Sequence, residues 1–198
     1  MAGVIKNGQN GVADFAVLSG VGILGGSMLR DFAIVATAYG ARLSDLKASG
    51  FAGMFSLVTG VVLSFSLGAI IAVFFGYDDP ISITTIGAGS VTFVVGPVTG
   101  SAIGASSEVI ALSIAVGLVK SILVMTVTPI VAKKIGLDNP RSAIVFGGLM
   151  GTNSGVAAGL AAVDPKLVPY GAMTATFYTA LGCLIVPSVL FILIDLLF

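Results

Sequence analysis

Two long apolar segments limit the possible fold more than any other feature of the sequence. Residues 51–76 carry no charged side chain, and residues 109–132 carry only Lys120. Each segment is longer than the roughly 20 residues that a helix needs to cross a bilayer. Only 9% of the 198 residues are charged and the mean hydropathy is +1.13, whereas about 25% of the residues of a soluble domain are charged. The sequence therefore predicts an all-α, multi-pass integral membrane protein.

The composition also argues against several classes of function. The formal net charge is +0, and His and Trp are both absent from the sequence. We therefore expect no nucleic-acid partner and no His-based metal or acid–base chemistry. The single cysteine, Cys183, lies in an apolar run and is expected to serve packing. The chain is not expected to be an enzyme, although spacing alone leaves a Ser and Lys nucleophile pair open.

Several further segments can be recognised along the chain. A short apolar segment, residues 15–29, ends at Arg30 and Asp31, and a mixed apolar and charged segment follows as an interfacial helix or connector would. A stretch rich in Gly, Ser and Thr separates the two clear spans, and a last apolar run closes the chain. These two segments are residues 81–107 and 170–198.

Basic loops predict the orientation of the spans. Such loops are expected on the cytoplasmic side, and there are two of them: Arg42 with Lys47, and Lys133 with Lys134 and Arg141. Both fall on one side only if residues 81–107 enter the membrane and return to the side from which they came. We therefore predict a re-entrant segment there, with Glu108 outside. The alternative is a full crossing with a weak charge bias.

A short motif occurs twice in the sequence. The stretches "GPVTGSAIG" (96–104) and "GTNSGVAAG" (151–159) both fit Gxx(S/T)GxAxG, and Gly151 follows Gly96 at an offset of 55 residues. We expect one transporter domain over residues 1–198 with two repeat units, about 81–132 and about 143–198. Each unit would hold a re-entrant hairpin and one spanning helix. Because the two hairpins would enter from opposite faces, the fold expected is a polytopic helical bundle with an inverted repeat.

The same motifs predict interrupted helices with a binding role. Non-helical backbone at membrane depth is tolerated where protein or a watery cavity satisfies it. Free N–H groups at half-helix starts favour a carboxylate, and unwound carbonyls and hydroxyls can hold Na+. The alternative is structural, because small residues also let neighbouring helices approach closely.

Lys120 is the one charge in the middle of a predicted span. At ~1.5 Å per residue it lies near the bilayer midplane, too deep to reach an interface easily. A lysine there predicts a countercharge for an anionic substrate. The alternative is an ion pair with an acid on another helix or on a partner subunit.

Four stretches carry a family resemblance: "GGSMLRDFAIVATAYG", "SITTIGAGSVTFVVGPVTGSAIGASSEVIALSIAVGLVKSILVM", "NPRSAIVFGGLMGT" and "SGVAAGLAAVDPKLVPYGAMTATFYTALGC". In them the chain resembles the MadM subunit of malonate:sodium symporters, over essentially its whole length. A fainter similarity, mainly in "GSVT" and in residues 139–181, is to the LrgB-type membrane proteins, which also work beside a small membrane partner. MadM proteins carry further apolar helices before the point where this sequence begins, so the chain is expected to be N-terminally short.

The resemblance implies a secondary active transporter subunit in the bacterial cytoplasmic membrane. It would take up malonate with Na+ as the coupling ion, need no organic cofactor, and work beside the small membrane subunit MadL. H+ is the alternative coupling ion. Two other functions stay open from the sequence: a non-transporting membrane scaffold or assembly subunit, and a channel for small organic anions.

For a malonate symporter, we assign candidate site residues from the charge of Lys120 and from the polar groups at the predicted helix interruptions. The ammonium, N–H groups and hydroxyls expected to hold malonate belong to Lys120, Ser90, Thr92, Thr99, Thr152 and Ser154. The oxygens expected to bind Na+ belong to Asn153, Thr152 and Gly151. If both ligands stabilise one occluded state, each raises the affinity of the other by the same factor.

Overall fold

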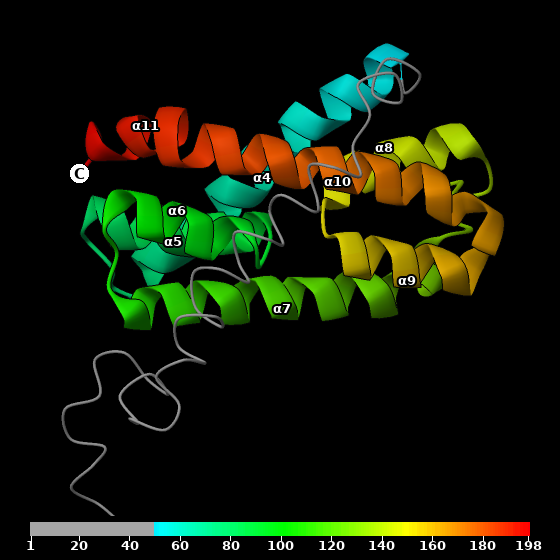
Figure 1. Cartoon of the computed structure of the whole chain (residues 1–198). Coiled ribbons are helices and arrows are strands. Elements are labelled where there is room, and N and C mark those ends of the chain that lie inside the picture. The colour runs from blue at the N-terminus through cyan, green and yellow to red at the C-terminus, as the bar shows by residue number, and fades with distance from the viewer. Residues whose placement is uncertain (1–49) are drawn as a thin grey trace, which may run out of the picture. The chain divides into compact units, whose positions relative to one another are not determined.

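The structure, a computed structural model, describes residues 50–198, and within them all regular elements are helices. The predictions for residues 15–29, Arg30, Asp31, Arg42 and Lys47 lie outside the described residues. The helices, shown in Figure 1, are α4 (Gly50–Phe74), α5 (Pro80–Val91), α6 (Val95–Ile103), α7 (Ser107–Val131), α8 (Pro140–Met150), α9 (Asn153–Val163), α10 (Val168–Ile185) and α11 (Phe191–Asp195). A short 3-10 helix, Pro165–Leu167, precedes α10, and a π-helical turn, Val186–Leu190, joins α10 to α11.

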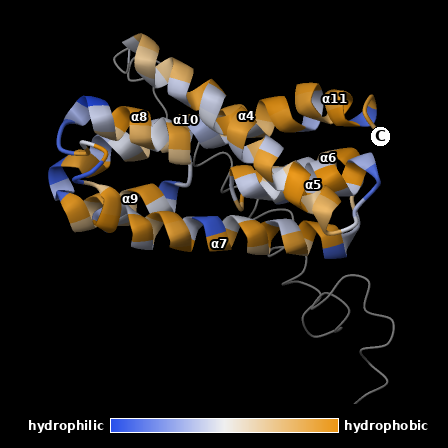
Figure 2. Ribbon diagram, turned by 180° about the vertical axis from the view of Figure 1, so that it is seen from behind, coloured by the Kyte–Doolittle hydropathy of each residue, from blue (hydrophilic) through white to orange (hydrophobic). Residues whose placement is uncertain are grey.

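Three helices among the described residues are long and apolar enough to cross a membrane. They are Gly50–Phe74, Ser107–Val131 and the continuous segment Pro165–Asp195. Figure 2 shows hydrophobic residues along these helices and hydrophilic residues mainly in the turns between them. The prediction of an all-α membrane protein with spans near residues 51–76, 109–132 and 170–198 is therefore confirmed.

The glycine-rich residues 81–107 form a helical hairpin, here called the first hairpin (α5 and α6). It begins where Asp79 accepts a hydrogen bond from the Ser82 N–H at 2.7 Å, next to Pro80 at the first helical position. It turns at Thr92, where α5 ends. Since α5 has 12 residues and α6 has 9, each is only ~14 to 18 Å long and too short to span a bilayer. The helix interruption predicted within residues 81–107 is thus present.

The second hairpin (α8 and α9) is built from the same local signals. Asn139 and Ser142 form a reciprocal capping box, Pro140 follows the cap, and α8 ends at Gly151 in the left-handed conformation with φ 70°. The cap residues Asp79 and Asn139 are 60 residues apart, as are Pro80 and Pro140. The hairpins therefore correspond at an offset of 60 residues, not at the offset of 55 of the glycine motif, because caps and prolines set where each hairpin begins.

Close glycine contacts place the two hairpins against opposite halves of α7. A Cβ atom on Gly89 of the first hairpin would lie 2.2 Å from the Ser113 carbonyl oxygen. A Cβ atom on Gly155 of the second hairpin would lie 2.7 Å from the Ser121 carbonyl oxygen. Gly159 of the same hairpin lies close to Thr128, which is about two turns after Ser121 on α7. These glycines let the hairpins approach α7 closely. This is the structural role that the sequence offered as the alternative to a binding role.

The other two long helices contact the hairpins in the reverse order. On α4, Gly60 meets the second hairpin at Gly148, and Gly68 meets the first hairpin at Ser90. On α10, residues near Gly171 contact the second hairpin, and Gly182 contacts the first. The helix α7 is therefore antiparallel to α4 and α10, and the hairpins enter from opposite ends with their tips facing each other (Figure 1). We interpret α5–α7 and α8–α10 as the two units of an inverted repeat.

Each hairpin has its own buried apolar cluster. Around the first hairpin the cluster includes Val61, Phe65, Ile83, Val91, Val95 and Val186. Around the second it includes Phe146, Val156, Leu160 and Leu167. The polar contacts described next lie where the two clusters meet, between the hairpin tips.

Candidate functional site

Lys120 lies midway along α7. Its Nζ atom donates hydrogen bonds to Ser64 Oγ on α4 at 3.0 Å, to the Val91 carbonyl oxygen at 2.9 Å, and to Tyr178 Oη on α10 at 3.3 Å. An ammonium has three N–H donors. All three are used, and they join α7 to three other helices.

The three partners of Lys120 are all uncharged. Within residues 50–198 the ammonium has no carboxylate partner, so the ion-pair alternative finds no support in the described residues. The Val91 carbonyl closes α5, where a helix dipole favours a positive charge. Lys120 therefore stabilises the end of α5 while its own charge stays uncompensated by any described acid.

Tyr178 connects Lys120 to the break between α8 and α9 at Gly151 and Thr152, here called the second break. It is fully buried, its hydroxyl donates to the Gly60 carbonyl oxygen at 3.1 Å, and the Lys120 Nζ atom lies 5.2 Å from its ring centroid. The ring also packs on Gly151, where a Cβ atom would lie 2.1 Å from Tyr178 Cε1. One side chain thus contacts the lysine and the backbone of the break.

The second break presents polar groups close to the same place. The Thr152 hydroxyl is hydrogen-bonded to the hydroxyl of Ser121, the residue after Lys120. No side chain caps the start of α9 at Thr152, so its first N–H groups are free of side-chain acceptors. Asn153 Oδ1 accepts a hydrogen bond from Thr176 Oγ1 at 3.4 Å.

Four of the residues predicted to bind substrate make no described hydrogen bond with Lys120 or with its partners. Thr92 accepts from the N–H groups of Val94 and Val95, both at 3.1 Å, and so caps α6. Ser90 packs against Gly68 of α4. Ser154 is exposed. Thr99 is fully buried in α6, and its hydroxyl has no hydrogen-bond partner among the described residues.

Three of the remaining predicted residues, Lys120, Gly151 and Thr152, lie close together. Tyr178 contacts both Lys120 and Gly151, and Thr152 is hydrogen-bonded to Ser121, the residue after Lys120. Asn153 follows Thr152 in the chain and contacts Thr176 of α10. Sequence reasoning missed the residues that make these contacts, which are Ser121, Thr176 and Tyr178, and also Ser64. A tyrosine in an apolar run is a partial signal, because its buried hydroxyl needs a partner. Ser64, Ser121 and Thr176 carried no such signal, because many similar hydroxyl side chains lie in the same helices.

The oxygens around the second break are neutral. Thr152, Asn153 and Thr176 offer hydroxyl and amide oxygens, and the described residues contain no group of three His, Cys, Asp or Glu side chains that could hold a metal ion. Such a donor set suits a monovalent cation such as Na+, which unwound backbone and hydroxyls bind in transporters.

Comparison with known proteins adds the family. No curated protein and no solved structure matches the chain. The family described as the malonate/sodium symporter MadM subunit matches residues 1–198, the whole sequence. Together with the membrane-spanning helices, this match establishes that the chain belongs to the malonate/sodium symporter MadM subunit family.

Proposed function

We propose that this chain forms the substrate path of a symporter that takes up malonate with Na+ across a bacterial cytoplasmic membrane. The observation that carries the proposal is Lys120, a lysine between two helix breaks whose described partners are all neutral. A positive charge at that depth is costly and is usually retained for function. A small dianion such as malonate would supply the missing negative charge.

Malonate binding would exchange weak partners for strong ones. One carboxylate would replace neutral acceptors of Lys120, such as Ser64 Oγ at 3.0 Å, because it adds the attraction of opposite charges to the hydrogen bond. The second carboxylate would accept from the uncapped N–H groups at the start of α9, where the helix dipole favours an anion. Lys120 and Thr152 are the side chains we assign to this site.

Na+ would bind beside malonate, at the oxygens of Gly151, Thr152 and Asn153, with Thr176 as a further ligand. The cation would offset the second negative charge of malonate. Because Tyr178 contacts both Lys120 and Gly151, binding at one site changes the packing of the other. This supports a single occluded state that both ligands favour, which makes their affinities reciprocal.

Transport by purified protein in proteoliposomes tests the proposal. The chain is reconstituted with the small membrane subunit MadL that the family resemblance implies, and radiolabelled malonate is added outside. We expect uptake above the external concentration when an inward Na+ gradient is imposed, and none when the gradient is absent. Accumulation driven by H+ alone would reassign the coupling ion. Passive equilibration that does not depend on Na+ would indicate a channel, and no uptake would indicate a scaffold.

A further inference from the structure

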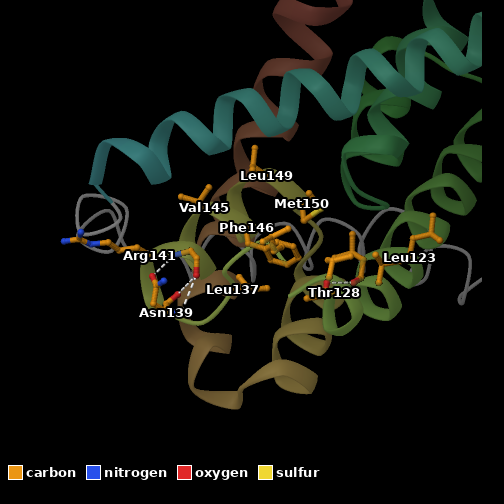
Figure 3. A pocket seen from close by; sticks show the side chains of 14 residues that line it. Leu123, Thr128, Leu137, Asn139, Arg141, Val145, Phe146, Leu149 and Met150 are labelled. Atoms are coloured by element: carbon orange, nitrogen blue, oxygen red, sulfur yellow. Dashed lines mark hydrogen bonds between the residues drawn. The ribbon is translucent and has the colours of Figure 1, made fainter. Parts of the chain in front are cut away.

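A long apolar groove opens on the surface between α7 and α8, and its wall on α7 begins one turn after Lys120. It has a volume of about 960 Å³. Its walls are apolar side chains of the two helices, among them Leu123, Val127 and Val131 of α7 and Phe146, Leu149 and Met150 of α8. Figure 3 shows these side chains gathered between the helices, with Arg141 and Asn139 at one end and Leu123 at the other.

The two ends of the groove differ in polarity. The end at Arg141 lies in the first turn of α8, after the loop that carries Lys133 and Lys134, and all three side chains are exposed. The one acid between Lys134 and α8 is Asp138, which accepts a hydrogen bond from Asn139 Nδ2 at 2.8 Å. Arg141 has no ion pair within residues 50–198. The groove therefore joins a positively charged rim to an apolar interior.

The length of the groove fits one leaflet of a bilayer. Its α7 wall runs from Leu123 to Val131, which is ~12 Å at ~1.5 Å per residue, and half of a hydrocarbon core is ~15 Å. It ends near Met150, directly before the break at Gly151. A spanning helix of a partner would need an apolar face through both leaflets. A lipid chain needs only this half.

We propose that this groove is a binding site for an anionic phospholipid, with an acyl chain along α7 and α8 and the phosphate group at Arg141. Basic pockets at the membrane surface between spanning helices attract such headgroups. The acyl chain would cover side chains that are otherwise exposed in the wall, such as Leu123 at 55% and Val127 at 43%. The site does not depend on the transport reaction.

Native mass spectrometry of the purified full chain tests the site with two lipids of identical chains, dioleoylphosphatidylglycerol and dioleoylphosphatidylcholine. We expect the wild type to retain the anionic lipid in preference. Arg141→Gln should lower retention of the anionic lipid about fivefold, the loss of one cation's attraction to the headgroup, and Arg141→Lys should restore it. Lys166→Gln, which removes an exposed lysine outside the groove, is the matched control.

A second pair of variants tests the apolar part of the groove. Val127→Phe should fill it and lower retention of both lipids, whereas Val119→Phe, at an exposed position of α7 outside the groove, should not. Equal retention by these two variants would overturn the proposal, and so would equal retention of the two lipids by the wild type. A disulfide from Val127→Cys to a partner subunit would also overturn it, because a protein helix would then occupy the groove.

Discussion

At the residue scale, the central feature of the described residues is one lysine, Lys120. Burying an ammonium in a membrane costs several kcal/mol by most estimates, and three hydrogen bonds to neutral acceptors compensate this cost only in part. Lys120 obtains them from three different helices. The same geometry stabilises the bundle and presents a cation between the two breaks.

Replacing Lys120 tests the proposed anion site directly. Lys120→Met keeps an unbranched apolar side chain and removes the charge, so malonate affinity should fall by about thirtyfold or more, which is the effect of about 2 kcal/mol. Equilibrium binding of radiolabelled malonate to the purified protein measures this. Lys166→Met, at an exposed position, should bind as the wild type does. Unchanged affinity in Lys120→Met removes Lys120 from the site.

Asn153 tests the proposed cation site. Asn153→Ala removes one neutral ligand, and we expect the Na+ concentration for half-maximal uptake to rise about tenfold, the effect of about 1.4 kcal/mol. Thr126→Ala is the control, because the exposed Thr126 hydroxyl bonds only to carbonyls of its own helix. An unaltered Na+ dependence would exclude Asn153 as a cation ligand.

Tyr178 tests how the two sites communicate. Tyr178→Phe keeps the ring on Gly151 and removes the hydroxyl between Lys120 and Gly60. The ratio of malonate affinities at saturating and at low Na+ should therefore fall towards one. Tyr170→Phe, a more exposed tyrosine of α10, is the control and should keep the wild-type ratio. A mutation that only loosens the fold would weaken binding at both Na+ concentrations alike and leave the ratio unchanged.

At the scale of single elements, glycines serve two distinct purposes. Gly89, Gly155 and Gly159 lie within helices and permit close contact with α7. Gly104 and Gly151 end α6 and α8 in the left-handed conformation. Among the glycines of residues 50–198, only Gly151 both has a left-handed conformation and lies in close contact with another side chain, because the Tyr178 ring covers it.

Comparing two glycine variants separates these two purposes. Alanine in the left-handed region costs ~1–2 kcal/mol, which is the whole expected effect of Gly104→Ala, since a Cβ atom there meets nothing within 4 Å. Gly151→Ala should cost a further ~1–3 kcal/mol, because its Cβ atom would overlap the Tyr178 ring. Thermal unfolding in detergent measures both variants. Equal destabilisation would mean that Tyr178 moves aside freely.

At the scale of the whole described unit, the two hairpins enter from opposite ends. The end shared by the first hairpin and the start of α7 carries the acids Asp78, Asp79 and Glu108, and the other end carries the basic loop with Lys133 and Lys134. This separation agrees with a cytoplasmic position of the basic end.

Labelling of single cysteines tests this topology. In a Cys183→Ala background, Glu108→Cys and Asp164→Cys should react with a membrane-impermeant maleimide from opposite sides, with Asp164→Cys reacting from the cytoplasm. Intact cells and inside-out vesicles give the two directions. Reaction of both positions from the same side would contradict the inverted repeat.

Within residues 50–198, the spans and the interruptions between them could be predicted from sequence patterns, because these signals are local. Charge-free length defines the spans, and a short run of residues sets each hairpin: Asp79 with Pro80, Asn139 with Pro140, and Gly151. Lys120 could be identified in the same way, since a charge in an apolar run is visible without any neighbour.

Which polar groups meet became visible only in the packing of the helices. Thr92 and Thr152 both lie at a break, yet Thr92 caps its own hairpin and Thr152 reaches Ser121 on another helix. Ser64 and Tyr178 meet Lys120 from 56 and 58 residues away in the sequence. The physical reason is that the local pattern fixes where a helix begins and ends, whereas the partner of a buried hydroxyl depends on the helix packed against it.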